Sequence, residues 1–315
     1  MPVRSKWQSL PTEAINPATL GIDKLESADI VEGMLNEDRK MLAAVQREKE
    51  RIAVGIDIVT QALRKSGRVV FVGAGTSGRL GVVESAEMPP TFGTPPDLVQ
   101  AIMAGGKEAI LGAREGVEDN YEEGARSINR LKPSKKDVVI GVSASGMTPF
   151  VRGALTRARR AGSKIIFVTC DPRTELQTFV DLTIAPAVGP EVIAGSTRLK
   201  AGTATKIVLN MLTTGAMVRI GKTYGNLMVD VQTGSEKLKD RARRIIIIVT
   251  GLEYDEADAL LGRAHWNVKA AIVMQKSGLS FTQALSRLRR AHDFVRDAIG
   301  EDVEPRLREL LERET

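Results

Sequence analysis

Two short segments of the chain combine glycine with serine and threonine between an apolar run and a helix-like pattern. These segments are Gly73–Gly78 and Gly141–Pro149. At a helix start, free backbone N–H groups and side-chain hydroxyls bind oxyanions, and the helix dipole adds to the attraction. Two such turns on neighbouring strands predict a site for a phosphate monoester. The expected ligands are Thr76, Ser77, Gly78, Ser143, Ser145 and Thr148.

Carboxylates near these turns offer acid–base chemistry. Glu84 and Glu87 share the predicted helix after the first turn, and Glu118 comes after the next predicted strand. Because Met-Pro-Pro follows Glu87, the helix is expected to stop there, and the negative end of its dipole favours a protonated general acid in a dry site. A solvated helix-end glutamate is the alternative for Glu87, and Glu84 competes for the role. Glu118 or Asp119 also suits a helix cap.

A third cluster, Gly195–Thr203, brings hydroxyls and two cations, Arg198 and Lys200, to the start of a long predicted helix. This composition also suits an anion. The alternative is a capped helix start with exposed basic residues.

The first turn also matches the dinucleotide fingerprint G-x-G-x-x-G through Gly73, Gly75 and Gly78. That fingerprint requires an acidic residue about 20 residues on, at the end of the next strand. The next apolar run, Leu98–Ala104, ends in Gly-Gly-Lys instead. A dinucleotide site is therefore disfavoured, and a tight turn without a ligand is the simpler alternative.

Short apolar runs alternate with helical patterns, which is typical of a parallel sheet with helices on both faces. The predicted strands are Val69–Val72, Leu98–Ala104, Val138–Val142, Ile165–Thr169 and Leu182–Ala185. The predicted helices are two within Asp29–Lys65, then Gly78–Glu87, Ala109–Leu131, Pro149–Ala161 and Lys200–Ile220. Ligands bind beyond the carboxyl ends of such strands, which is where both glycine turns fall. After the loop Gly221–Asp230, four or five helices broken at Gly251, Gly262, Gly278 and Gly300 predict a small helical domain.

Composition narrows the classes of function. The net charge is +6, but Ser235–Thr315 holds 15 basic and 14 acidic residues, and aromatics are only 4%, so nucleic acid is not an expected partner. Two histidines leave little material for a triad or a zinc site. The single cysteine, Cys170, fits a reducing cytoplasm, and we expect it to be a small buried hydrophobe. No secretory signal is visible, and no apolar run approaches the roughly 20 residues of a membrane helix.

Several long sequence words together resemble the N-acetylmuramic acid 6-phosphate etherase family, which has the sugar isomerase (SIS) fold. They are GAGTSGRLGVVESAEMPPTFG, AGGKEAILGAREGVEDN, SASGMTP, GPEVIAGSTRLKAGTATKIVLNMLTT and NLMVDV. The match runs from about Pro11 to Asp230 and is weaker in the tail. It implies a three-layer α/β/α fold with a five-stranded parallel sheet. The implied domains are an N-terminal helical extension (1–50), an SIS domain (51–232) and a C-terminal helical domain (233–315).

The resemblance also implies a reaction: removal of the D-lactyl ether from N-acetylmuramic acid 6-phosphate (MurNAc 6-phosphate) by elimination and then water addition, in cell-wall amino-sugar recycling. By the family motifs, Glu87 is the acid that aids lactate departure, and Glu118 is the second catalytic glutamate and C2 base. No metal or organic cofactor is implied. By analogy Ser77, Ser143, Ser145 and Thr148 hold the 6-phosphate, and Arg198 and Lys200 lie near the substrate, facing its lactyl carboxylate. Family members are homodimers with the site near the subunit interface.

The sequence departs from the family pattern at Met88, where cysteine is common, and at Glu84, where aspartate is common. Three other functions share the fold. A sugar-phosphate isomerase needs neither the second glutamate nor the GSTRLK word. A sensor like the glucokinase regulatory protein is longer, with two SIS units. A transcription regulator needs a helix-turn-helix, and residues 1–66 contain no basic recognition helix.

Overall fold

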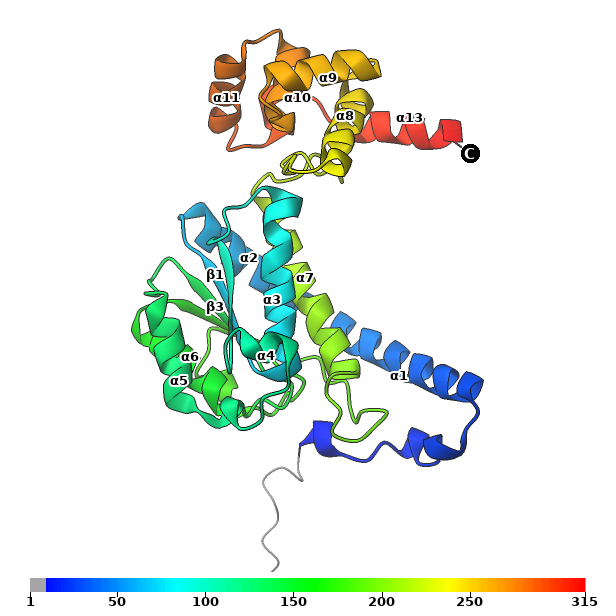
Figure 1. Cartoon of the computed structure of the whole chain (residues 1–315), viewed down its shortest axis with the longest axis vertical. Helices are drawn as coiled ribbons and strands as arrows, with labels where there is room; N and C mark the ends of the chain where they lie inside the picture. The colour runs from blue at the N-terminus through cyan, green and yellow to red at the C-terminus, as the bar shows by residue number, and fades with distance from the viewer. Residues whose placement is uncertain (1–9, 315) are drawn as a thin grey trace, which may run out of the picture. The chain divides into compact units, whose positions relative to one another are not determined.

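The computed structural model describes residues 10–314, with side chains up to Glu312. Its centre is one parallel sheet of five strands in the order β2-β1-β3-β4-β5 (Figure 1). The strands are β1 (Val69–Gly73), β2 (Val99–Met103), β3 (Val138–Val142), β4 (Lys164–Val168) and β5 (Leu182–Ile184). Every residue of β1 and β3 is buried, as expected for strands covered on both faces. The predicted fold class and all five strands are confirmed.

Helices cover both faces of the sheet (Figure 1). Successive side chains along each strand face opposite layers. On one face lie α2 (Lys49–Arg64), α3 (Gly75–Phe92) and α7 (Lys200–Arg219). On the other face lie α5 (Tyr121–Arg130) and α6 (Pro149–Arg160). A Cβ added at Gly81 of α3 would lie 2.8 Å from Phe71, whereas Val70 and Val72 share a core cluster with Leu155 of α6. The two strands β1 and β3 end in register, with Gly73 opposite Val142, so the turns that follow them start side by side.

Before the sheet, an N-terminal segment (residues 10–24) leads into α1 (Ser27–Arg47). The segment contains three short 3-10 turns, at Pro11–Glu13, Pro17–Thr19 and Ile22–Lys24. The prediction of two helices within Asp29–Lys65 is confirmed by α1 and α2.

The prediction that the first helix stops near Glu87 is wrong, because α3 continues through Pro89 and Pro90 to Phe92. The fixed φ of proline suits a helix, so the cost lies mainly in the lost N–H donors and the ring's contact with the preceding turn. Met88 and Phe92, one turn apart, are both buried, and the burial of each side chain stabilises the last turn by about 1.5–3 kcal/mol. The N–H of Gly93 then closes the helix on the carbonyl of Pro89 at 3.0 Å.

The predicted single helix over Ala109–Leu131 is also wrong. The chain forms α4 (Glu108–Leu111), a 3-10 turn at Val117–Asp119, and then α5. Gly116 has a φ of +76°, a conformation that favours glycine and that no helix continues. Asn120 caps α5 by accepting the N–H of Glu123 at 2.9 Å. Neither Glu118 nor Asp119 therefore serves as this helix cap.

By the contacts among its residues, the chain divides into two compact units. One comprises the residues up to Ala86 and Pro96–Gly215; the other comprises Glu87–Pro95 and Ala216 onward. The predicted boundaries after residues 50 and 232 stay predictions.

The second unit has its own apolar core and is helical, as expected. Its helices are α8 (Glu236–Thr250), α9 (Tyr254–Arg263), α10 (Val268–Ser277), α11 (Phe281–Arg290), α12 (Val295–Ile299) and α13 (Glu304–Glu314). Gly251, Gly278 and Gly300 end helices in the left-handed conformation. The break predicted at Gly262 falls at the end of α9, which continues one residue further, to Arg263, without a left-handed glycine. Within residues 10–314, no helix combines the length and apolar character needed to cross a bilayer.

Candidate functional site

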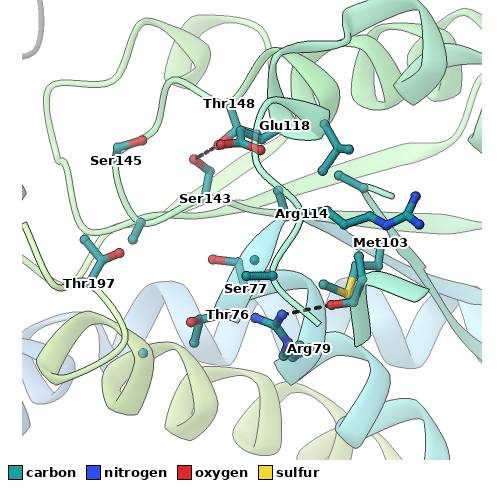
Figure 2. A pocket seen from close by; sticks show the side chains of 18 of the residues that line it. Thr76, Ser77, Arg79, Met103, Arg114, Glu118, Ser143, Ser145, Thr148 and Thr197 are labelled. Carbon is teal, nitrogen blue, oxygen red and sulfur yellow. Dashed lines mark hydrogen bonds between the residues drawn. The ribbon is translucent and has the colours of Figure 1, made fainter. Parts of the chain in front are cut away.

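A pocket of about 340 Å³ opens at the carboxyl ends of β1 and β3, a volume in the range of small-molecule sites (Figure 2). Its walls come from five parts of the sheet unit: the two glycine turns, the chain from the end of β2 to Glu118, the start of α7 and the N-terminal segment. The polar and charged side chains that line it are Glu13, Thr76, Ser77, Arg79, Arg114, Glu115, Glu118, Ser143, Ser145, Thr148, Thr197 and Thr205.

The first glycine turn joins β1 to α3. Gly75 has a φ of +53°, and α3 begins at this residue, so Thr76 and Ser77 lie in its first turn and line the pocket. Gly73 and Gly78 have a packing role, because a Cβ on Gly73 would come within 2.6 Å of the backbone nitrogen of Gly78. The Gly78 N–H donates to the carbonyl of Ala74 at 3.2 Å. Gly78 thus keeps strand and helix close together and is not itself among the lining residues.

The second turn joins β3 to α6 and supplies three hydroxyls. The Oγ of Ser143 and the Oγ1 of Thr148 lie 2.7 Å apart, and both side chains point into the pocket with Ser145 (Figure 2). Thr148 occupies the N-cap position of α6, yet its side chain makes no capping hydrogen bond. The start of α6 therefore presents a hydroxyl and uncapped N–H groups to an anion. Five of the six predicted phosphate ligands come together here.

Glu118 lines the same pocket from the loop between α4 and α5, and it is half-buried. Arg79 of α3 fixes the base of this loop. Its guanidinium donates to the carbonyls of Ala109 and Ile110 at 2.9 Å each and of Gly112 at 3.0 Å. These three bonds satisfy carbonyls at the C-terminal end of α4, where a cation is favoured. Arg79 thus connects the helix that carries the first phosphate turn to the loop that carries Glu118.

Four predicted site residues do not line the pocket: Gly78, Glu87, Arg198 and Lys200. Glu87 is exposed on α3 and belongs to the helical unit, and Arg198 is exposed before α7. Glu84, the competitor of Glu87, is buried and accepts hydrogen bonds from Asn210 and Thr213 of α7. Glu84 therefore joins two helices.

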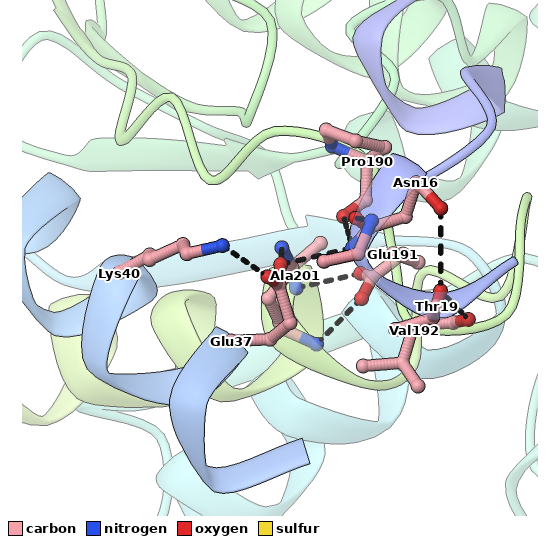
Figure 3. A network of polar contacts seen from close by, with 10 residues as sticks. Asn16, Thr19, Glu37, Lys40, Pro190, Glu191, Val192 and Ala201 are labelled. Carbon is pink, nitrogen blue, oxygen red and sulfur yellow. Dashed lines mark hydrogen bonds and ion pairs between the residues drawn. The ribbon is translucent and has the colours of Figure 1, made fainter. Parts of the chain in front are cut away.

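The predicted substrate contact of Lys200 is contradicted by its burial. Its ammonium lies 2.5 Å from the carboxylate of Glu37 in α1, and both side chains are almost fully buried. Burial alone would raise the pKa of Glu37, but hydrogen bonds from Lys200, Lys40 and Asn16 outweigh it and lower the pKa to about 2 (Figure 3). The buried carboxylate of Glu191 caps α7 by accepting the N–H groups of Lys200 and Ala201 at 2.9 Å each. Lys200 is thus an internal cation that fixes the start of α7.

Sequence reasoning missed several lining residues. Thr197 and Thr205 lie within or beside the cluster Gly195–Thr203, and Arg79 directly follows the first glycine turn, Gly73–Gly78. Glu13 carried no local signal, because it is 60 residues or more from the glycine turns. The expectation for Cys170 is confirmed: it is buried, and burial raises the pKa of its thiol to about 12, so it is not a nucleophile at neutral pH.

Comparisons with known proteins agree with this architecture. Residues 51–159 match the family model of the glucokinase regulatory protein N-terminal SIS domain. A phosphoheptose isomerase from Francisella tularensis has a similar fold, with a TM-score of 0.50 and 18% identity over 62% of this chain and 100% of that one.

Comparison of sequences identifies a narrower family than comparison of folds. N-acetylmuramic acid 6-phosphate etherase of Salinibacter ruber is 49% identical over 94% of this chain and 95% of its own length. The proteins of the same name from Clostridioides difficile and Photorhabdus laumondii are 46% and 43% identical, each over 93% of this chain and over 96% and 97% of their own lengths. With identity at this level over nearly the whole chain, the protein belongs to the N-acetylmuramic acid 6-phosphate etherase family.

Proposed function

We propose that this protein is a carbon–oxygen lyase that converts MurNAc 6-phosphate to N-acetylglucosamine 6-phosphate (GlcNAc 6-phosphate) and D-lactate. The observation that carries the proposal is the joining of a doubled phosphate-binding turn and Glu118 in one pocket of a chain from the etherase family. We place the reaction in cell-wall amino-sugar recycling in the cytoplasm, where a single buried thiol is expected to stay reduced.

The phosphate is held by neutral donors. Ser77 at the start of α3 and Ser143, Ser145 and Thr148 at the start of α6 offer hydroxyls, and both helix dipoles point their positive ends at the pocket. This anchoring sets the position of the sugar carbons relative to Glu118. We propose that the exposed Arg198 faces the lactyl carboxylate.

The chemistry needs one base and one acid. In the ring-opened sugar, the C2 proton is acidic because it lies beside the C1 aldehyde, and Glu118 removes it. The C3–O bond then breaks, the lactyl oxygen takes a proton from Glu87, and a C2–C3 double bond forms. Water adds across this bond, giving hydroxyl to C3 and a proton to C2. Carboxyl groups in different surroundings can serve as acid and base in this way.

The position of Glu87 bears on oligomeric state. It is exposed on α3 and is not among the residues that line the pocket of its own chain. We propose a homodimer in which Glu87 of each chain completes the pocket of the other. Such two-fold arrangements are the commonest closed assemblies of soluble proteins.

Incubating the purified protein with MurNAc 6-phosphate in deuterated, oxygen-18-enriched water tests the function. We expect D-lactate to be released without the oxygen label, with deuterium at C2 and oxygen-18 at C3 of the sugar product, measured by mass spectrometry and NMR. Binding of the substrate without lactate release would contradict the lyase and favour a sensor of sugar phosphates.

Replacing Arg79 with methionine is expected to lower kcat/KM about 10- to 100-fold, because the loop of Glu118 loses three hydrogen bonds and a small displacement of a catalytic group is costly. Steady-state kinetics on lactate release measures this. Arg126→Met is the control, since Arg126 is exposed on α5 and pairs only with Glu123 among the described contacts. Equal activity of the two variants would exclude the positioning role.

A further inference from the structure

We infer that Glu13 of the N-terminal segment contacts the sugar in the pocket, as an acceptor for an O–H or N–H group of the substrate; this inference rests on the proposed function. Glu13 lines the pocket with the phosphate-binding hydroxyls, although it lies 60 residues or more from either glycine turn in sequence. It ends the first 3-10 turn of the segment, Pro11–Glu13.

The chain opposite Glu13 is shaped around its carboxylate. Gly195 donates its N–H to the carbonyl of Thr12 at 3.2 Å, which joins the segment to the loop before α7. A Cβ on Gly195 would lie 3.1 Å from the Oε2 of Glu13, and the φ of +77° at Gly195 also favours glycine. Gly195 therefore gives both the turn and the space that the Glu13 side chain occupies. Thr197, two residues further on, lines the pocket.

After Glu13, the segment is held by one buried and two partly buried hydrogen bonds (Figure 3). The side-chain amide of Asn16 donates to Glu37 at 2.9 Å and to the carbonyl of Pro190 at 3.3 Å. The hydroxyl of Thr19 donates to the carbonyl of Val192 at 2.9 Å. Because Glu37 also holds Lys200, one buried carboxylate fixes both the segment and the start of α7. These bonds fix the segment that carries the exposed Glu13 at the edge of the pocket.

The charges of the pocket show what kind of group Glu13 meets. Arg79 already donates to three carbonyls, and Arg114 already pairs with Glu108. Within residues 10–314, the Glu13 carboxylate has no hydrogen bond or ion pair with another residue. A carboxylate repels the phosphate and lactyl groups of the substrate, so its partners are the neutral donors of the sugar: hydroxyl or acetamido N–H. Glu13 thereby makes the pocket selective for sugar phosphates over simple anions.

The test compares Glu13→Ala and Glu13→Gln with the wild type by calorimetric binding of GlcNAc 6-phosphate and of inorganic phosphate. We expect Glu13→Ala to weaken sugar-phosphate binding at least about tenfold, the loss of a hydrogen bond to a charged group. Binding of inorganic phosphate should be unchanged or tighter, because a negative charge is removed. Glu13→Gln keeps an acceptor oxygen, so its affinity for GlcNAc 6-phosphate should lie between those of the wild type and Glu13→Ala.

The control is Asp23→Ala, an exposed carboxylate of the same segment that does not line the pocket. Unchanged binding of GlcNAc 6-phosphate by Glu13→Ala would overturn the inference. A parallel loss for both ligands would also overturn it, since it would mean that the pocket has loosened. Binding does not require turnover, so failure of the lyase proposal would appear separately, as absent lactate release by the wild type.

Discussion

Glu87→Gln is expected to lower the rate of lactate release by about 10³-fold or more, while solvent deuterium still exchanges into C2 of MurNAc 6-phosphate. The amide cannot protonate the departing lactyl oxygen, but Glu118 still removes the C2 proton. Glu118→Gln should lose exchange and release together, because elimination needs the proton to leave first. NMR of the C2 proton and an enzymatic lactate assay separate the two variants. Glu122→Gln, an exposed glutamate of α5 outside the pocket, is the control.

The same pair of variants reports on the proposed dimer. When unfolded chains of Glu87→Gln and Glu118→Gln are mixed and refolded together, half of the dimers are mixed, and each has one intact pocket if Glu87 acts on the other chain. About a quarter of the wild-type activity should then return. If a pocket uses the Glu87 of its own chain, the mixed dimers stay inactive. Loss of both C2 exchange and lactate release by Glu87→Gln, with C2 exchange kept by Glu118→Gln, would reverse the two roles.

Lys200→Met is expected to destabilise the fold by about 3 kcal/mol, because it leaves the buried carboxylate of Glu37 without its buried partner. Denaturant unfolding at pH 7 measures this. Lys40→Met is a matched control, since Lys40 pairs with the same carboxylate but is 63% exposed, and its loss should cost less than about 1 kcal/mol. Equal effects of the two variants would contradict the internal role of Lys200.

The pH dependence of this effect has a definite sign. The pKa of Glu37 is lowered from its ordinary value of 4.5 to about 2, so its ionised pair stabilises the folded state fully above pH 4.5. The contribution is lost as the pH falls from about 4.5 towards 2. The difference in unfolding free energy between wild type and Lys200→Met should therefore shrink over this range. A difference that grows on acidification would show that another group is responsible.

Sequence patterns predicted the sheet and both phosphate turns, because buried strands and glycine-rich turns are encoded over a few neighbouring residues. The end of the helix after β1 was harder to predict, since Pro89 and Pro90 usually indicate that a helix stops before them. Burial of Met88 and Phe92 outweighs that signal, and this tertiary effect is invisible to a local rule.

Charged residues were the least predictable from sequence alone. Arg198 and Lys200 are two positions apart, yet one is exposed and the other is neutralised by Glu37, 163 residues away. By position alone, Glu84 and Glu87 were equally suited to catalysis. The family motifs favoured Glu87, and the contacts of Glu84 with α7 show that Glu84 joins two helices. Glu13 lines the pocket because the N-terminal segment packs beside the loop before α7, and no sequence spacing predicts this packing. The role of each charged side chain therefore depends on partners that are far away in the sequence.

Helix α3 begins at the first phosphate turn and contains Glu87 near its other end. Between Ser77 and Glu87 such a helix advances about 15 Å. Only six covalent bonds, of about 1.5 Å each, separate the phosphorus from the C3 oxygen of the substrate. In the proposed dimer, α3 therefore contacts two substrate molecules. Its first turn binds the phosphate of one, and its last turns approach the ether oxygen of the other.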